Sequence, residues 1–486
     1  MCLCKTNVIL RLRAEWRLLE RDHIMAIMKA YTLPHPPLAV PSVWKGKESK
    51  EISDTLNAMD KVASDIASIA PETIIYITPH STVYSDYFHI SPGETAHGDL
   101  GRFGAPGEVF ETNYDTELVR EIMHVAEMKG IYAGSQGEKD AKLDHGVTVP
   151  MWFINKRYSD YKSIRISQSG MTPIEHYMFG QIIAEAAANV GRKTVLIASS
   201  DLSHKLTADG PYGFAPEGPE FDKMIISAIE ESKLLTLFEV SDELRERAGE
   251  CGYNSLTILT GCFDKINLET KLISYEGPFG VGYAVAEFTP TTSKESKGVL
   301  EVHLNNSLKN MESFRASEDE YQRLARGSLE HMVLIGEEIT APSDLSDELI
   351  NIKAGVFVSI HKDGRLRGCV GTISPSTESV ASEIIQNAVS AGLSDNRFEP
   401  VNESELPYLT YKVDVLAKPE PISEPSQLDI ERYGVIVTSG FKRGLLLPNL
   451  DGIDTVDDQI MIAKNKAGIS SEEKVKLERF EVIRHG

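Results

Sequence analysis

Four histidines lie beside short apolar segments, at points where a chain commonly leaves a strand or enters a helix. His35 is found in YTLPHPPL, His80 in IIYITPHS, His145 in KLDHGVTVP and His204 in VLIASSDLSH. Neutral imidazole is the commonest protein ligand for a metal ion, and it also transfers protons near neutral pH. Each histidine taken singly is better explained as a structural residue, but the four together predict one shared site.

Prolines stand directly beside His35 and His80. Because the proline ring fixes φ, it holds the chain rigidly at a sharp exit from a strand, which suits a metal ligand. Two histidines and one carboxylate leave open positions on iron(II) for a substrate and oxygen. A later loop, AGECGYNSLTIL, offers Glu250 and its neighbour Cys251. The alternative for Glu250 is an ordinary acid in the first turn of a helix.

The elements that must position these residues repeat along the first part of the chain. From about residue 28 to 288, strand-like runs such as TIIYIT and TVLIAS alternate with helical patterns such as DTELVREIMHVAEMKG. This alternation predicts an α/β domain around a mixed or largely parallel sheet with flanking helices. The carboxyl ends of strands in such a sheet converge on one crevice, where the histidines would meet.

A second domain is expected after a stretch with nothing to bury. FTPTTSKESKG indicates a linker at 289–299, and residues 300–486 combine an amphipathic helix with several strands, which predicts an α+β fold. In this half, Cys369 follows Arg365 and Arg367, and nearby cations can make a thiol nucleophilic. A small buried cysteine on a strand, with the arginines pointing outward, is an equally good interpretation. Arg367 and Cys369 are therefore a candidate site.

Composition limits the classes of function. The 486 residues include 72 acidic and 50 basic side chains, a formal charge of −22, which disfavours nucleic acid and anionic membrane surfaces as partners. The five cysteines form no CxxC pair, so we expect a reducing cytoplasm rather than a disulfide framework. No apolar run is long enough to span a bilayer, and residues 1–27 are expected to be an extension without a signal peptide. A homo-oligomer stays open.

Six segments of the first domain occur in an order that is typical of a known family. LPHPP, TPH, DHGVTVP, SSDLSH, ECGYNSL and GPFGVGYAVAEF lie between residues 28 and 288. This part resembles the class III extradiol ring-cleavage dioxygenases of the LigB type and their Memo-like relatives. The resemblance implies iron(II), with zinc as the alternative, held by His35, His80 and Glu250. The Memo-like branch has a cysteine in the corresponding loop, which makes Cys251 the alternative third ligand.

The same resemblance implies a reaction and the residues that serve it. A small catechol-like aromatic substrate would react with dioxygen, and His204 would remove and return protons. Asp201 and Ser203 flank His204 and would fix its ring, as outer hydrogen-bond partners do. His145 would orient a substrate oxygen, while Asp144 would cap the helix that starts there.

The second domain resembles the AMMECR family through GRLRGCVGTISP and the downstream RGLLLP. Fusion of the two domains resembles the system in which AMMECR, Memo-like and radical-SAM proteins occur together, which implies a radical-SAM partner. The first hypothesis is an iron(II) extradiol-type dioxygenase with an accessory AMMECR domain. The alternatives are a non-enzymatic metal- or redox-binding module that serves this partner, and a metal-dependent hydrolase on the same scaffold.

Overall fold

The structure is a computed structural model that describes residues 26–486 except 45–49, 141, 292–297, 363 and 451. The chain divides into two compact units, the first ending at His303 and the second starting at Leu304. Of the extension expected at 1–27, residues 1–25 lie outside the described residues. The expected linker at 289–299 takes in the end of a strand, the undescribed residues 292–297 and the start of a helix.

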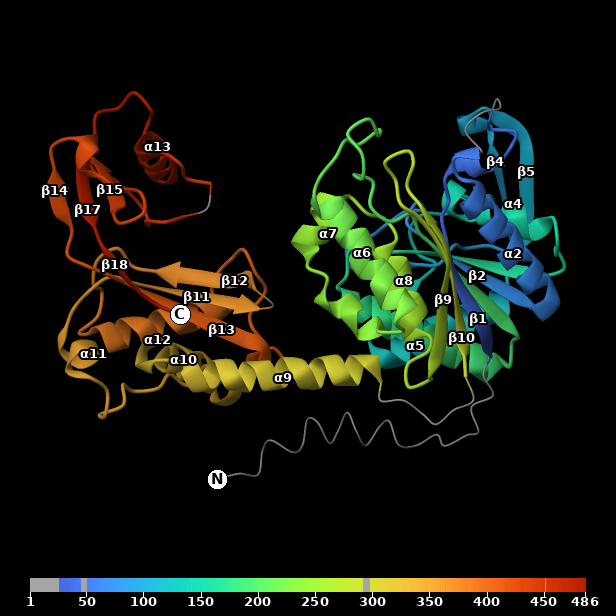
Figure 1. The fold of residues 1–486 in the computed structure, drawn as a ribbon. Helices are drawn as coiled ribbons and strands as arrows, with labels where there is room; N and C mark the ends of the chain where they lie inside the picture. The colour runs from blue at the N-terminus through green and yellow to red at the C-terminus, as the bar shows by residue number, and fades with distance from the viewer. Residues whose placement is uncertain (1–25, 45–49, 141, 292–297, 363, 451) are drawn as a thin grey trace. The chain divides into compact units, whose positions relative to one another are not determined.

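The first unit is built around a six-stranded mixed sheet, which confirms the predicted α/β fold (Figure 1). In spatial order the strands are β7 (Lys162–Ser167), β2 (Thr73–Thr78), β8 (Thr194–Ser199), β1 (Ile27–Leu33), β10 (Tyr283–Pro290) and β9 (Leu268–Glu276). The first four strands in spatial order pair in parallel, and the last two pairings, β1 with β10 and β10 with β9, are antiparallel.

Both faces of this sheet are covered, which explains why its central strands are apolar at every position. In β2, Ile75 and Ile77 face one buried cluster, and Ile74 and Tyr76 face the other. The first cluster is completed by α3 (Thr116–Lys129), α5 (Pro173–Val190), α6 (Glu217–Glu230) and α8 (Tyr253–Gly261). The second is completed by α2 (Ser53–Ile69) and α4 (His145–Asn155).

Two of these helices approach each other closely enough to require glycine. A Cβ atom on Gly180 of α5 would lie 2.0 Å from the carbonyl oxygen of Ile258 in α8. The start of α5 is stabilised by a capping box, in which Thr172 and Glu175 each bond the other's backbone N–H. This packing places the start of α8, and the loop before it, against the central strands.

Shorter elements complete the first unit. They are η1 (Pro37–Ala39), β3 (Phe88–His89), β4 (Thr95–Leu100), η3 (Gly101–Phe103), β5 (Ala105–Asn113), β6 (Ala133–Gly134), η4 (Leu234–Glu239) and α7 (Asp242–Ala248). Strands β4 and β5 form a hairpin, and β3 pairs with β6.

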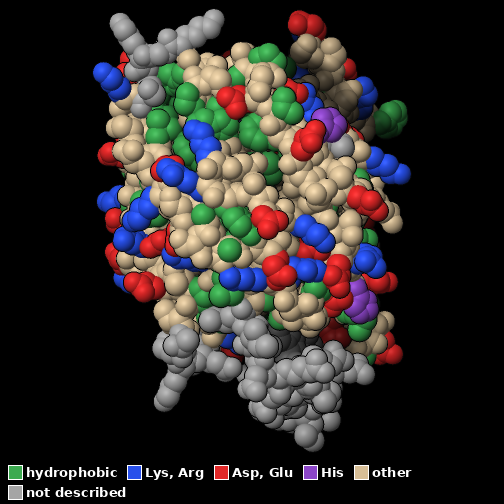
Figure 2. Space-filling view, turned by 90° about the vertical axis from the view of Figure 1, so that its right-hand side faces the viewer, with side chains coloured by type: hydrophobic (Ala, Val, Ile, Leu, Met, Phe, Trp, Pro, Cys, Tyr) green, Lys and Arg blue, Asp and Glu red, His purple; other side chains and the backbone are tan. Residues whose placement is uncertain are grey.

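Figure 2 shows one face of the molecule, on which side chains of both charges are interspersed rather than segregated by sign.

The second unit contains two antiparallel four-stranded sheets with helices packed against them, which confirms the predicted α+β fold. The first sheet comprises β12 (Arg365–Gly371), β11 (Val356–Lys362), β13 (Leu409–Leu416) and β18 (Val482–His485). The second comprises β14 (Glu420–Ile422), β17 (Lys476–Phe480), β15 (Gly434–Ser439) and β16 (Lys442–Leu446).

Helices of the second unit bury the apolar sides of its sheets. Leu324, Leu329, Ile384 and Ala388, from two helices, share a core with strand β11. The helices and turns are α9 (Val299–Ser317), α10 (Glu320–Ile335), α11 (Asp347–Asn351), α12 (Val380–Leu393), η5 (Leu406–Tyr408), η6 (Pro425–Gln427) and α13 (Val456–Lys466). Among the described residues, no helix is both long and apolar enough to cross a bilayer.

Candidate metal centre

Three neighbouring parallel strands end at the same edge of the first unit's sheet, and a predicted histidine follows each of them. His35 is two residues past β1, His80 is two residues past β2, and His204 is five residues past β8. His145 is the first residue of α4. The rule that side chains beyond the carboxyl ends of parallel strands share one crevice therefore accounts for the arrangement.

Two of these histidines and one cysteine direct their donor atoms at one another. The Nε2 atoms of His35 and His80 lie 2.9 Å apart, and Cys251 Sγ is 3.6 Å from His35 Nε2. All three donor atoms lie within 4.8 Å of one another, a spacing that suits ligands of a single ion. His35 is buried, with 1% of its surface exposed, so little water competes for this position.

A buried serine selects the ring nitrogen that His35 presents. Ser199, the last residue of β8, donates its hydroxyl hydrogen to the carbonyl oxygen of Gly146 (2.5 Å). Its oxygen lies 2.8 Å from His35 Nδ1 and therefore accepts a hydrogen from that nitrogen. Because Nδ1 carries the proton, Nε2 is unprotonated and free to bind a metal. Metal-binding histidines are commonly held in this way by a hydrogen-bond partner on the other ring nitrogen. Ser199 is the first residue of SSDLSH, but its role was not predicted from that segment.

The histidine rings are held in their neutral form. Burial lowers the pKa of His35 well below its usual value, and the neighbouring rings of His80 and His145 lower it further. Burial lowers the pKa of His80 to about 4, with a further contribution from His145. Burial and then Arg102 lower the pKa of His145 to about 4. At neutral pH these rings are uncharged, which is the form that coordinates a metal.

The cysteine is brought to this place by the loop before α8. A Cβ atom on Gly252 would lie 2.4 Å from the Cβ atom of Ser200, so only glycine lets the loop lie against the end of β8. Gln168, just past β7, donates to the carbonyl oxygen of Cys251 at 2.8 Å. Burial raises the pKa of the Cys251 thiol, and a bound cation would favour its thiolate.

Glu250, the expected third ligand, is engaged elsewhere. Its carboxylate accepts hydrogen bonds from Arg245 Nε (3.1 Å) and from the backbone N–H of Tyr253 (2.7 Å) in the first turn of α8. These partners match the simpler interpretation of Glu250 as a first-turn acid. The structure therefore brings the alternative, Cys251, to the two histidines in place of Glu250, and the expectation is corrected accordingly.

His145 lies within the same crevice. Its ring stacks on His80, with centroids 4.1 Å apart and an angle of 23° between the planes. Asp144 occupies the position before α4 but makes no capping bond, which corrects the expected role. Its carboxylate instead accepts from the hydroxyl of Thr78 at 2.6 Å, and this bond ties the start of α4 to the end of β2.

His204 is close to the same group but is held differently from the prediction. Its Nε2 is buried without a hydrogen-bond partner among the described residues, and its ring stacks on Tyr212 with centroids 5.2 Å apart. Asp201 accepts from the backbone N–H of His35 (2.9 Å), and Ser203 donates to the carbonyl oxygen of Ala248 (3.0 Å). The bonds of Asp201 and Ser203 thus secure the surrounding loops, and neither reaches the His204 ring.

Two family models match the chain, one over each half. The model of the catalytic LigB subunit of aromatic ring-opening dioxygenase matches residues 29–286, and the AMMECR1 model matches residues 322–485. The chain belongs to the LigB family. Its LigB domain is fused to a C-terminal AMMECR1 domain.

Some relatives match nearly the whole chain, and others match about a third of it. Protein CA_C1420 of Clostridium acetobutylicum is 40% identical over 477 residues, which cover 95% of this chain and 99% of that protein. A protein of Thermotoga maritima is 44% identical over 170 residues, 35% of this chain and 98% of that protein. The crystal structure of uncharacterized protein PH0010 from Pyrococcus horikoshii is 31% identical, covers 34% of this chain and 88% of its own, and has a TM-score of 0.32.

In the AMMECR1 domain the two candidate residues have separate partners. Arg367 pairs through two nitrogens with Glu405, at 3.0 Å each. The Cys369 thiol accepts from the hydroxyl of Ser359 at 3.2 Å, and its backbone N–H donates to Asp395. Arg367 is therefore paired with the carboxylate of Glu405, whereas the Cys369 thiol is paired with the neutral hydroxyl of Ser359.

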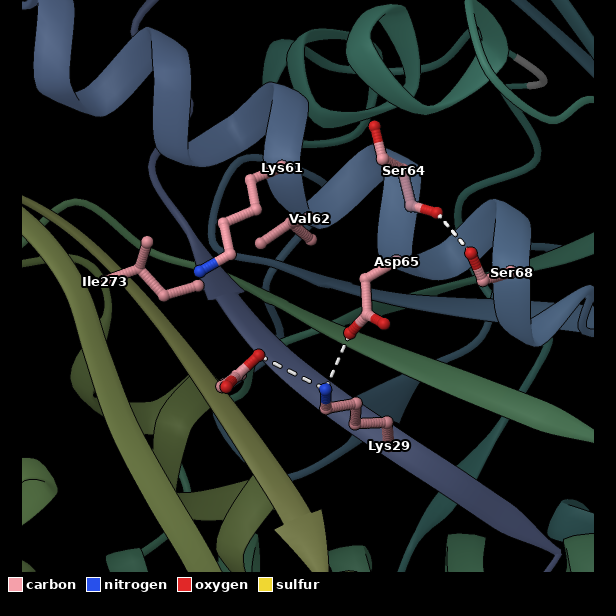
Figure 3. Close-up of a pocket in the computed structure, with 8 residues that line it drawn as sticks. Lys29, Lys61, Val62, Ser64, Asp65, Ser68 and Ile273 are labelled. Carbon is pink, nitrogen blue, oxygen red and sulfur yellow. Dashed lines mark hydrogen bonds and ion pairs between the residues drawn. The ribbon is translucent and has the colours of Figure 1, made fainter.

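The LigB domain also contains a polar pocket of about 310 Å³ away from the histidines. Lys29 pairs there with Asp65 at 2.6 Å, as Figure 3 shows. It also pairs with Glu287 at 3.2 Å. Lys29 is near the start of β1, whereas His35 follows the end of that strand. Since the charge of Lys29 is matched by two carboxylates, this pocket is explained as an ion-pair network that joins β1, α2 and β10.

Proposed function

We propose that the LigB domain is an iron(II)-dependent oxidoreductase, whose metal is held by His35, His80 and Cys251 and whose substrate is a small catechol-like aromatic molecule. The observation that carries the proposal is the convergence of three donor atoms within 4.8 Å. The contact from Ser199 supports it, because this contact leaves Nε2 of His35 free for a metal. Iron(II) would supply open coordination sites that bring the catechol and dioxygen together, and the electrons that reduce dioxygen would come from the catechol itself.

The protein's own groups would manage protons and exclude water. His204 Nε2 is buried without a hydrogen-bond partner in the described part of the chain, so it is available to accept a proton from a substrate hydroxyl and to return it later. Burial lowers the pKa of His204, which keeps the ring neutral and ready to act as the base. His145, stacked on His80, would orient the aromatic ligand beside the metal.

Cys251 favours a second candidate function. A thiolate is a softer ligand than a carboxylate and selects softer or redox-active metals, whereas two histidines and one carboxylate are typical of iron(II) oxygenases. A non-enzymatic metal- or redox-binding module, serving a radical-SAM partner, is therefore the alternative proposal. A hydrolase on the same scaffold would be a zinc protein.

Metal content and oxygen consumption distinguish these functions. Protein purified without oxygen is analysed for iron, zinc and copper, and then given a panel of catechols with oxygen uptake and ring-opened products as the readouts. Iron near one ion per chain with oxygen uptake supports the oxidoreductase. Iron or copper without uptake on any catechol supports the binding module, and zinc with ester or amide hydrolysis supports the hydrolase.

The partners are proposed on the same basis. The domain fusion motivates a radical-SAM partner, and co-purification of the full chain with a radical-SAM enzyme from the same cells tests it. If no radical-SAM enzyme co-purifies with the chain at physiological salt, the proposal of a binding module that serves such an enzyme is contradicted. Light scattering of the purified chain tests whether it forms a homo-oligomer.

A further inference from the structure

The loop that follows His204 is anchored at its base. Residues 205–216, here called the cover loop, join His204 to α6. The backbone N–H of Ala215 donates to the carbonyl oxygen of Lys205 at 3.1 Å, and this bond closes the loop. The backbone N–H of Leu206 donates to a carbonyl oxygen of the turn between β9 and β10 at 3.0 Å. These bonds fix where the cover loop leaves the domain.

The tip of the cover loop turns back onto His204. The backbone N–H of Gly210 donates to the carbonyl oxygen of Thr207, and that of Gly213 donates to the carbonyl oxygen of Gly210, at 3.2 Å each. Gly213 has a φ of 74°, a left-handed conformation that glycine adopts readily. Tyr212 lies between these two glycines, and its ring stacks on that of His204 with centroids 5.2 Å apart and an angle of 28° between the planes.

Tyr212 contacts His204 from the solvent side. The tyrosine is 61% exposed, whereas His204 is half-buried. A ring exposed to this extent contributes little to a hydrophobic core, because the gain from burial scales with the apolar area removed from water. The position of the Tyr212 ring is therefore explained by its contact with His204.

Backbone bonds attach His204 to the loop that carries Cys251. The backbone N–H of His204 donates to the carbonyl oxygen of Ala248 at 3.2 Å, and the hydroxyl of Ser203 donates to the same oxygen. Cys251 Sγ lies 3.6 Å from the carbonyl oxygen of Asp201. His204 thus forms part of the wall of the candidate metal centre, and Tyr212 covers the outer side of that wall.

Stacking is the contact that orients the His204 ring. Its Nε2 has no hydrogen-bond partner among the described residues, and the side chains of Asp201 and Ser203 bond elsewhere. The backbone bond to Ala248 fixes the main chain of His204 but leaves the two side-chain torsions free. Where no hydrogen bond selects the ring orientation, packing against a neighbouring ring does so.

We propose that Tyr212 is a positioning residue of this site, whose ring holds the His204 ring in place and covers it from solvent. The inference rests on the proposed function, because it supports the histidine that would accept and return a proton there. A general base acts only within hydrogen-bond reach of the proton that it removes, so the orientation of its ring matters. The ring of Tyr212, rather than its hydroxyl, supplies this contact.

Reaction with diethyl pyrocarbonate tests the inference without requiring turnover. The reagent modifies neutral imidazole, and peptide mass spectrometry gives a separate rate for each histidine. Full-length protein at neutral pH is compared with Tyr212→Ala and Tyr212→Phe. We expect His204 to react about two- to tenfold faster in Tyr212→Ala, the range that corresponds to the loss of one aromatic contact. Tyr212→Phe keeps the ring and should react at the wild-type rate.

Phe214→Ala is the matched control. Phe214 is also a largely exposed aromatic residue of the cover loop, but its ring stacks on no other ring among the described residues. This variant should leave the rate at His204 unchanged. His124, exposed on α3, supplies the rate of an uncovered histidine, and the fully buried His176 reports any general loosening of the domain.

Four results would overturn the inference. They are a wild-type His204 that reacts as fast as His124, equal His204 rates in the wild-type protein and Tyr212→Ala, an equal acceleration by Phe214→Ala, and a parallel acceleration at His176. The last result would mean that the substitution loosens the whole domain.

Metal content and turnover of the same samples separate this inference from the proposed function. If the protein holds no iron or opens no catechol ring, the proposed function fails, and the reaction rates at His204 alone decide the role of Tyr212. If the protein is active, Tyr212→Ala should slow single turnover about two- to tenfold, and Tyr212→Phe should restore it. An unchanged single-turnover rate in active Tyr212→Ala would overturn the positioning role.

Discussion

Replacing Ser199 with alanine tests how the metal centre is organised. Ser199 is fully buried and connects His35 Nδ1 to the carbonyl oxygen of Gly146. Removal of its hydroxyl leaves one buried donor and one buried acceptor without a partner, each costing about 1–3 kcal/mol of unfolding free energy. It also releases the His35 ring from the orientation that presents Nε2, and loss of such a partner typically weakens metal binding about 10- to 100-fold.

The neighbouring strand offers a matched control. Ser167 ends β7 as Ser199 ends β8; it is also fully buried, but its hydroxyl has no hydrogen-bond partner among the described residues. Ser167→Ala should therefore leave both metal affinity and stability close to those of the wild-type protein.

Both variants are measured by chelator competition under anaerobic conditions and by urea unfolding of the metal-free protein. The expected result is weaker metal binding and lower stability in Ser199→Ala alone. Equal metal affinities in Ser199→Ala and Ser167→Ala would refute the argument that Ser199 selects the ring nitrogen of His35. A loss of stability without a loss of affinity would restrict Ser199 to a structural role.

Three further predictions concern the residues around this centre. Cys251→Ala should lose bound metal, whereas Glu250→Ala should keep it and lose about 1–3 kcal/mol of unfolding free energy, because the backbone N–H of Tyr253 loses its acceptor and Arg245 keeps only Asp242 and Asn254; metal content and urea unfolding of both variants decide this. His204→Ala should retain its metal but slow single turnover by about 10²- to 10⁴-fold, so an iron-free variant would instead make His204 a ligand. Burial raises the pKa of Asp222 to about 7, so the folded state binds this proton more tightly than the unfolded state, and stability should fall as pH rises from about 4 to about 7. Urea unfolding across this range should give a flatter profile for Asp222→Asn, and an identical slope would contradict the assignment.

The architecture of the LigB domain and the region of its candidate site follow from local patterns in the sequence. A strand such as TIIYIT, apolar at every position, is stable only when both of its faces are covered, and this requirement predicts a sheet between two layers of helices. Residues just beyond parallel strands meet at one edge, so the positions of His35 and His80 were sufficient to predict their proximity. These inferences depend on periodicity and chain direction, which are local properties of a sequence.

Which donor lies beside the two histidines depends on the packing of the whole domain. Glu250 and Cys251 are adjacent, and their direction depends on contacts that no local pattern records: Gly252 lies against Ser200, and Arg245 binds the carboxylate. Ser199 was missed for the same reason, since its importance comes from a hydrogen bond to a carbonyl group 53 residues earlier in the chain. A hydrogen bond requires its atoms to lie within a few tenths of an ångström of the right separation, and packing across the whole domain determines that separation.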